Sequence, residues 1–283
     1  MWDISAVFDA YTIPLGDWIQ GAVDWLVFHF RWFFLLVRWP IAKTLDGLQA
    51  FFQGVPTWAF LIALFLIAWR TAGLRTAACS VVAFIFIGFL GLWSVAMTTV
   101  AMVLTSVFFC VVAGVPLGIL AANSDRFAGL LRPLLDAMQT TPTFVYLVPI
   151  VMLFGIGNVP AVISTIIVAL PPMIRLTNLG IREVRSDLIE AGYAFGCTRW
   201  QLLREIQLPL AMPTLMAGLN QALMLSLSMV VIAALIGAGG LGLTVYQGIN
   251  RLNVGLAGTA GLAIVLLAIT LDRITQGIQK PRD

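Results

Sequence analysis

The feature that most restricts how this chain can fold is a series of long apolar runs separated by short polar segments. A run of about 20 mostly apolar residues is long enough to cross the hydrocarbon core of a bilayer as a helix. Hydrophobic residues make up 60% of the chain and charged residues only 10%, whereas soluble domains have about 25% charged residues. We therefore expect an all-α, polytopic transmembrane helical bundle of about seven spans, at residues 54–69, 74–97, 98–121, 138–157, 159–178, 213–237 and 256–274.

The basic residues alternate between the two sides of these spans. Most of them lie in or beside the 70–75, 122–133 and 179–210 segments and the C-terminus, whereas the opposite segments carry only Arg251. Short loops rich in Lys and Arg stay in the cytoplasm. The sequence therefore predicts a multi-pass protein with its N-terminus outside and its C-terminus in the cytoplasm. The first 50 residues do not follow this rule, because their basic residues fall on the outer side: Arg31, Arg38 and Lys43.

Those first 50 residues also differ in pattern from the rest of the chain. Tryptophan recurs at every seventh position, each time directly after a charged residue: Asp17-Trp18, Asp24-Trp25, Arg31-Trp32 and Arg38-Trp39. This period places the tryptophans along one helical face. A helix lying in the membrane interface would keep them at the level of the headgroups and the charges in water. We expect residues 18–39 to form an N-terminal amphipathic interfacial helix within a segment 1–50, apart from a transmembrane domain 51–283; a helix packed on the bundle is the alternative.

The longest loop on the basic side, residues 179–210, has the pattern of two short helices. Its first half carries Glu190 among small residues, and Gly196 can end that helix because glycine tolerates the left-handed conformation. Pro209 closes the segment before the next span. A short rigid helix between two spans is suited to docking a cytoplasmic partner, although a plain interspan loop would share several of these features.

This loop resembles the EAA loop of ABC importer permeases. The resemblance rests on the combined spacing of Glu190, Ala191, Gly192, Gly196, Ile206, Leu208 and Pro209. The third position of the motif is usually Ala and is Gly here, a change between two small residues. Three further segments, 136–158, 169–181 and 236–274, are similar to the permeases for glycine betaine, proline betaine and choline, and the likeness extends over about residues 95–275.

The resemblance implies a type I ABC importer permease fold and the other parts of such a transporter. Two permease subunits, here a second copy of the same chain, would surround the translocation path in the bilayer of the cell inner membrane. Two copies of a cytoplasmic ABC ATPase would dock on the coupling loop 179–210, with residues 190–196 as the coupling helix. An extracytoplasmic substrate-binding protein would deliver the substrate. ATP and Mg²⁺ would belong to the ATPase, so we expect no cofactor, metal site, catalytic residue or nucleic-acid partner for this chain.

Of two common nucleotide-binding motifs, one occurs in the sequence and the other does not. Gly237, Gly239 and Gly242 form a Gly-x-Gly-x-x-Gly, but it follows a span rather than a strand, and no acidic residue lies about 20 positions further on, as a dinucleotide fold requires. We interpret it as a flexible outer turn near the contact with the binding protein, or as a simple span-ending loop. The Gly-x-x-x-x-Gly-Lys-Ser/Thr phosphate-binding motif does not occur in the sequence, so ATP is expected to bind another chain.

Together these patterns predict the permease subunit of an ATP-driven importer for quaternary-amine osmolytes. Hydroxyl groups near the start of the fourth predicted span are candidates for lining its path: Thr140, Thr141, Thr143 and Tyr146. Three alternatives remain at this point: an importer for another small solute, such as an amino acid or a sulfonate, an ion-coupled secondary transporter, and a non-transporting scaffold. The secondary transporter would need acidic residues inside the spans or paired repeats.

Overall fold

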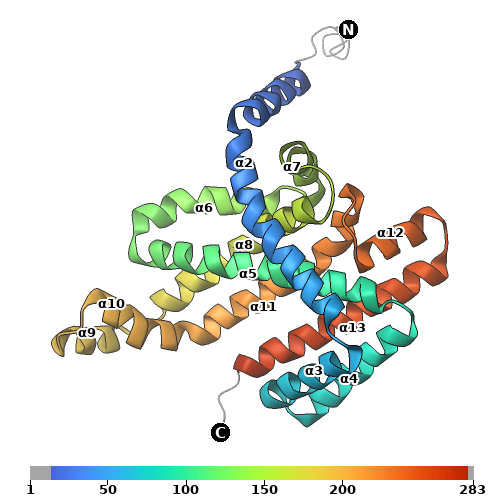
Figure 1. Cartoon of the computed structure of the whole chain (residues 1–283). Coiled ribbons are helices and arrows are strands. Elements are labelled where there is room, and N and C mark those ends of the chain that lie inside the picture. The colour runs from blue at the N-terminus through green and yellow to red at the C-terminus, as the bar shows by residue number, and fades with distance from the viewer. Residues whose placement is uncertain (1–13, 280–283) are drawn as a thin grey trace, which may run out of the picture.

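The computed structural model describes residues 14–279, and every regular element in that range is helical (Figure 1). In chain order they are α2 (Leu15–Gly54), α3 (Thr57–Ala72), α4 (Leu74–Phe89), α5 (Trp93–Asn123), α6 (Asp125–Thr140), η1 (Thr143–Tyr146), α7 (Leu147–Phe154), α8 (Asn158–Arg182), α9 (Ser186–Ala194), α10 (Arg199–Gln201), η2 (Leu202–Gln207), α11 (Leu208–Ala233), η3 (Ala234–Ile236), α12 (Leu241–Asn250) and α13 (Val254–Gln279). The predicted all-α class is therefore confirmed.

Four helical stretches are long and apolar enough to cross a membrane: α5, α8, the continuous stretch Arg199–Ile236, and α13. Two further candidates are pairs of helices bent at a short break, by 107° between α2 and α3 and by 103° between α6 and the η1–α7 segment. The described residues thus provide four to six spans, and the predicted polytopic bundle is confirmed. The apolar helix α4, with 16 residues, is shorter than a full span.

The predicted boundary between the second and third spans, at residues 97–98, is wrong. Helix α4 ends at Phe89 and α5 begins at Trp93. Gly91 makes the turn between them with a φ of +72°, a conformation that glycine adopts without steric cost. Because apolar residues flank this glycine on both sides, the break does not show in the hydrophobic pattern.

Two predictions around α6 also need correction. The segment 122–133 was expected to be a loop, but most of it is the first half of α6, and the predicted span 138–157 is broken after Thr140. The break follows from Pro142, because a proline pushes the residue before it out of the helical region. Thr141 accordingly has extended backbone, with φ −69° and ψ 129°.

The centre of the bundle is the crossing of α5 and α8. Gly114 and Gly118 on α5 face Met173 and Thr177 on α8, and a Cβ atom added to Gly118 would lie only 2.5 Å from the Cβ atom of Thr177. Small residues let two membrane helices approach closely and gain van der Waals contact. The crossing therefore fixes α8, the helix that continues into the 179–210 loop.

Helix α2 runs across the bundle rather than along it (Figure 1). It has 40 residues with a kink at Phe30, where φ is −111° and ψ is 16°. Its second half buries Ile41 and Leu45 in a cluster formed with α5, α7 and α8. The four tryptophans of the seven-residue repeat are all more than half exposed: Trp18, Trp25, Trp32 and Trp39. The crosswise direction is what an interfacial helix requires, while the position of α2 in the membrane and the division at residue 50 stay predictions.

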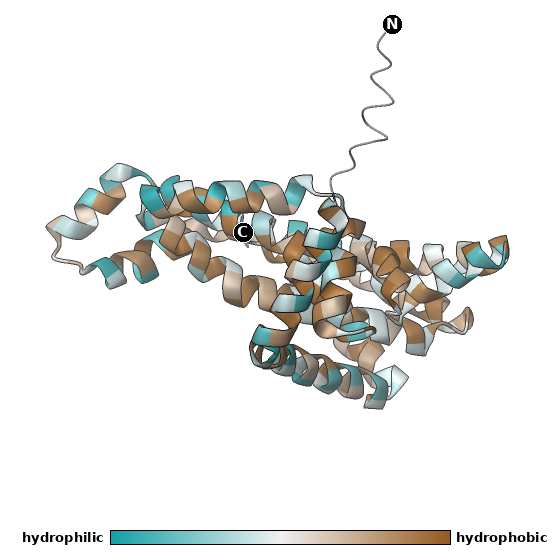
Figure 2. Cartoon of the chain, turned by 90° about the horizontal axis from the view of Figure 1, so that it is seen from above, coloured by the Kyte–Doolittle hydropathy of each residue, from teal (hydrophilic) through white to brown (hydrophobic). Residues whose placement is uncertain are grey.

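The surface and the two ends of the bundle agree with a membrane domain. Figure 2 shows that hydrophobic residues predominate along the helices of the bundle, and side chains such as Phe89 and Val82 are 86% and 65% exposed. At one end, Arg182 donates a hydrogen bond of 2.8 Å to the carbonyl oxygen of Ala121, which joins α8 to the end of α5. The far end of α13 packs against the end of α3. The 122–133 and 179–210 segments thus meet at the ends of α5 and α8, and the 70–75 segment meets the end of α13, while the orientation across the membrane stays a prediction.

Candidate functional site

The chain between α8 and α11 forms a helical hairpin that projects from one end of the bundle (Figure 1). We call residues 186–207 the loop hairpin. Its first arm is α9, and its second arm is α10 followed by η2, a π-helical segment that runs directly into α11. The structure therefore contains the two short helices that the sequence pattern predicts.

Gly192 is the point at which the two arms of the loop hairpin touch. It is buried, and an added Cβ atom would lie 2.7 Å from Cδ1 of Leu202 and 2.9 Å from Cδ1 of Ile206. Alanine, the usual residue of the motif, would require these side-chain tips to move. The structure thus brings together two of the predicted positions, Gly192 and Ile206, and this contact gives their spacing in the sequence a physical reason.

Gly196 makes the turn between the arms, with a φ of +80°. The N–H group of Cys197 donates to the carbonyl oxygen of Gly192 at 3.0 Å and closes the end of α9. The second arm begins with a capping box, in which the side chains of Thr198 and Gln201 each accept a hydrogen bond from the backbone N–H of the other. The turn is therefore fixed on both sides.

The outward surface of the loop hairpin combines a carboxylate with aromatic rings. Glu190 and Ala191 are exposed, and Glu190 forms no ion pair within residues 14–279. Phe195 at the tip is 89% exposed and Trp200 is 66% exposed. Sequence reasoning missed Phe195; its position directly before the turn glycine was the available signal. Exposed aromatic side chains on a rigid projection are suited to burial against a partner protein.

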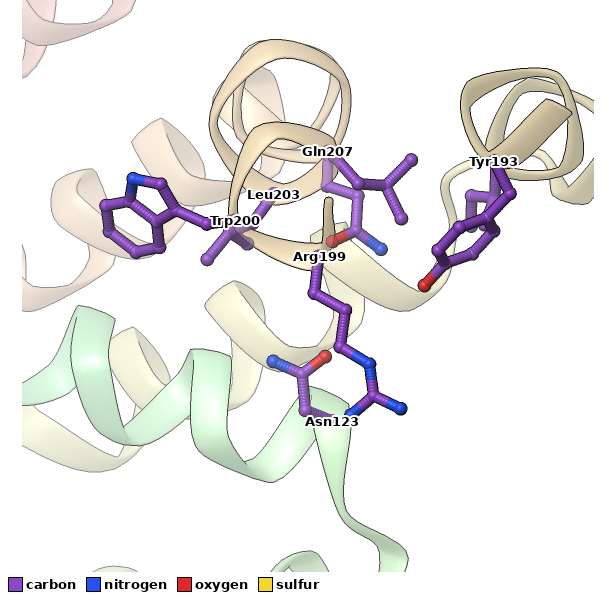
Figure 3. A pocket seen from close by; sticks show the side chains of 8 residues that line it. Asn123, Tyr193, Arg199, Trp200, Leu203 and Gln207 are labelled. Carbon is purple, nitrogen blue, oxygen red and sulfur yellow. The ribbon is translucent and has the colours of Figure 1, made fainter. Parts of the chain in front are cut away.

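A cavity of about 600 Å³ opens between the two arms and the end of α5 (Figure 3). Figure 3 shows Arg199 reaching toward Asn123, with Tyr193 on the opposite arm. The lining mixes apolar and polar side chains from α5 and from both arms: Asn123, Ile189, Tyr193, Arg199, Trp200, Leu202, Leu203 and Gln207. The cavity is large enough to receive a side chain from a docked partner.

Leu208 and Pro209 join the loop hairpin to the bundle. Leu208 packs against a buried cluster that includes Ile181 and Leu203. Pro209 lies at the start of α11. Proline has no N–H group, and its ring clashes with the carbonyl four residues earlier, so an undisturbed α-helix cannot run through this point. The π-helical geometry of η2, directly before Pro209, accommodates this disturbance.

The four residues predicted to line a path lie at the bend between α6 and α7: Thr140, Thr141, Thr143 and Tyr146. The hydroxyl oxygen of Tyr146 lies 2.7 Å from the carbonyl oxygen of Met138, so this side chain holds the end of α6. Thr140 and Thr141 donate to carbonyl groups of their own helix. Three of the four hydroxyls therefore have a structural partner, and their place in a path stays a prediction.

The Gly-x-Gly-x-x-Gly segment 237–242 packs against the turn 155–158, and we call these two segments the glycine junction. The N–H of Gly239 donates to Oδ1 of Asn158 at 2.6 Å. These contacts do not agree with the freely flexible turn expected from the glycines.

A second side chain holds the same segment. The N–H of Leu241 donates to Oγ1 of Thr99 at 2.8 Å. In a dinucleotide site, such backbone N–H groups would face the phosphates. Here they are occupied by protein side chains, which supports the rejection of the nucleotide reading.

Known proteins related to this chain show its family. The family of binding-protein-dependent transport system inner membrane components matches residues 114–282. The glycine betaine/proline betaine permease ProW of Escherichia coli is 56% identical over 277 residues, which is 98% of this chain and 78% of that protein. The glycine betaine/carnitine permease GbuB of Listeria monocytogenes is 46% identical over 273 residues, 95% of this chain and 96% of that protein. A structure of the methionine ABC transporter MetNI in inward-facing conformations aligns with a TM-score of 0.58 and 26% identity, over 64% of this chain and 93% of the matched chain.

The chain belongs to the family of inner-membrane components of binding-protein-dependent transport systems. It is a multi-pass permease subunit of an ABC importer and not an enzyme, and ATP hydrolysis takes place in a separate subunit. The expected type I ABC importer permease fold is confirmed. This family implies an ATPase and a substrate-binding protein as partners, and it decides against the ion-coupled secondary transporter and the scaffold.

Proposed function

We propose that this chain forms the translocation path of an ATP-driven importer for glycine betaine, proline betaine or choline. The observation that carries the proposal is the 56% identity to a glycine betaine/proline betaine permease along 98% of the chain. The relative at 46% identity is named for glycine betaine and carnitine, so both are named for methylated ammonium compounds. An importer for another small solute is the second candidate, and the methionine transporter supports it at 26% identity.

The proposed assembly is a symmetric pair of permease subunits. A closed two-fold pair is the commonest assembly for a single bundle. Each loop hairpin would dock on one of two ATPase copies in the cytoplasm, which hold ATP and Mg²⁺. The binding protein would meet the end that carries the glycine junction, with the N-terminus on that outer side and the C-terminus in the cytoplasm. Four hydroxyl side chains would line the path between the two subunits: Thr140, Thr141, Thr143 and Tyr146.

The construction of the loop hairpin supports a role in coupling. It is continuous with α11 through η2, and only three residues separate it from α8. Because Gly192 packs against Ile206 and so joins the two arms, a displacement of α9 would be transmitted to both α8 and α11. Converting a path from 99% inward-facing to 99% outward-facing takes about 5.5 kcal/mol of differential binding, which two bound ATP molecules can supply.

The test of the transport proposal is uptake by the reconstituted complex. The chain would be placed in proteoliposomes with its ATPase and binding protein, and labelled glycine betaine and choline would be offered. We expect uptake that requires ATP and is lost when the phosphate-binding Lys of the ATPase is replaced. Uptake that persists without ATP hydrolysis but stops when an ion gradient is dissipated would contradict the proposal.

The coupling loop is tested by reversing one charge. Glu190→Arg is expected to lower uptake at least tenfold, because reversing a charge within a docked interface costs several kcal/mol and about 1.4 kcal/mol already corresponds to a factor of ten. The matched control is Asp24→Arg, which reverses an exposed carboxylate on α2, outside the coupling loop. Normal uptake by Glu190→Arg at a normal membrane level would rule out docking on this face, and Gly196→Trp provides a second variant on the same turn.

A further inference from the structure

Helix α6 is held to the bundle more lightly than the spans around it. Only Ala128 and Leu135 of its 16 residues are buried, and Leu130 is 76% exposed. Both ends of the helix meet extended backbone, at Ser124 (φ −146°, ψ 111°) and at Thr141 (φ −69°, ψ 129°). The helix can therefore shift as one unit about these two points.

Two ion pairs join α6 to α8. Asp125 contacts Arg182 at 2.7 Å, and Asp136 contacts Arg175. The two acids are 11 residues apart on α6 and the two arginines are seven residues apart on α8, which is close to three and two helical turns, respectively. Each helix therefore presents both of its charges on one face. We call these two pairs the charge ladder.

The inner pair of the charge ladder lies further from the loop hairpin than the outer pair, at a partly exposed position between α6 and α8. Arg175 lies about 10 Å further from the C-terminal end of α8 than Arg182 does. Its neighbours Ile174 and Thr177 are buried. A charge at such a position in a membrane helix is costly unless a partner compensates for it. The side chains of Arg175 and Asp136 are 43% and 63% exposed, and they line a cavity of about 440 Å³ between α5, α6 and α8. The pair joins the two helices and is open enough to re-form when they shift.

The outer pair connects the charge ladder to the coupling loop. Arg182 also donates to the carbonyl oxygen of Ala121 and to Oδ1 of Asn178, each at 2.8 Å. The first arm of the loop hairpin begins four residues further along the chain, at Ser186. A displacement of the loop hairpin therefore reaches Arg182 first, and through Asp125 it reaches α6.

We propose that the charge ladder makes α6 move with α8 when the loop hairpin is displaced. The motion is thereby carried to the bend after Thr140 and to the residues beyond it that were assigned to the path. Asp136 and Arg175 are then positioning residues, because they act on the path through α6 and do not contact the substrate. This inference rests on the proposed function, since it takes the loop hairpin to be the part that receives the ATPase.

The first experiment reverses one charge and then both. Arg175→Asp places two carboxylates side by side, and uptake of glycine betaine is expected to fall about tenfold while ATP hydrolysis by the complex continues. The number of ATP molecules hydrolysed per transported molecule therefore rises, whereas a folding defect would lower both rates together. The double variant Asp136→Arg/Arg175→Asp restores the attraction and should recover uptake. Arg126→Gln is the matched control on α6, because Arg126 forms no ion pair within the described residues.

The second experiment does not depend on the substrate. After replacement of the native cysteines, spin labels at Gly129→Cys on α6 and Leu179→Cys on α8 report the distance between the two helices. With the charge ladder intact, one narrow distance distribution is expected with and without ATP; with Arg175→Asp, the distribution should broaden. A distribution that stays equally narrow in the variant would overturn the inference, as would normal uptake by Arg175→Asp or a double variant as inactive as the single one. Absence of uptake by the unaltered complex would instead contradict the proposed function.

Discussion

The loop hairpin and the glycine junction are two glycine-rich turns of the same bundle, yet they use glycine for different reasons. In the loop hairpin, Gly196 has nothing within 4 Å of an added Cβ atom, so only its φ of +80° requires glycine. In the glycine junction, an added Cβ atom would lie 2.6 Å from Oγ1 of Thr99 at Gly240 and 2.1 Å from the carbonyl oxygen of Val230 at Gly242. One turn has open space around it, and the other is filled by its own protein. The difference indicates an open surface at one end of the bundle and a tightly packed, fixed joint at the other.

The largest effect is expected from overpacking the glycine junction. Gly242→Ala places a methyl group against the backbone of α11, which cannot move as a side-chain tip can, and such overpacking costs about 1–3 kcal/mol or more. We expect a strong loss of folded protein in the membrane and a lower Tm of the purified chain. The matched control is Gly239→Ala, whose nearest neighbour would be at 3.4 Å. Equal Tm values for the two variants would show that the glycine junction is not tightly packed.

The next largest effect is expected from loss of one hydrogen bond in the glycine junction. Asn158→Leu removes the acceptor for the N–H of Gly239 in a partly buried hydrogen bond, and the loss of such a bond costs about 1 kcal/mol or more. The Tm should fall, while the affinity of the folded protein for its ATPase should stay unchanged because the loop hairpin lies at the other end. A weakened ATPase affinity would show that the two ends are not independent.

The two regions also differ in how far the sequence predicts them. The loop hairpin is formed by residues close in the chain, so its two short helices could be predicted from the sequence, and the resemblance to the EAA loop indicated Glu190, Gly192 and Ile206. In the glycine junction, 81 residues separate Asn158 from Gly239 in the chain. No local pattern marks such a partner, and the glycines alone suggested a flexible turn.

The same limit explains the errors in the spans. Apolar runs predicted the bundle, but the break at Gly91 lies inside apolar sequence, and the break before Pro142 depends on backbone geometry rather than on hydrophobicity. The charge ladder was not predicted either, because Asp136 and Arg175 lie 39 residues apart in the chain. Apolar runs give the class of the fold, whereas contacts between helices and backbone geometry decide how many spans form and where they bend.

A smaller effect is expected at Gly196, in the turn of the loop hairpin. Gly196→Ala has space for the methyl group but forces a left-handed conformation that costs about 1–2 kcal/mol, confined to the loop hairpin. We expect a weaker affinity for the ATPase with an unchanged Tm of the bundle, measured by titrating the ATPase onto the reconstituted permease. Gly129→Ala on α6, where an added Cβ atom also has nothing within 4 Å, is the control and should change neither quantity. A lower Tm for Gly196→Ala would mean that the loop hairpin is part of the stable core.

The smallest effect is expected from removal of a single cap in the loop hairpin. Thr198→Ala deletes the side chain that accepts from the N–H of Gln201, and loss of an N-cap costs about 1 kcal/mol. The amides at the start of α10 should exchange hydrogen faster, while those of the glycine junction should keep their rates, because one cap affects only its own helix end. Faster exchange in both regions would show that the loop hairpin and the glycine junction open together as one cooperative unit. In that case opening of the loop hairpin would also loosen the glycine junction, and the contrast between an open turn at one end of the bundle and a fixed joint at the other would fail.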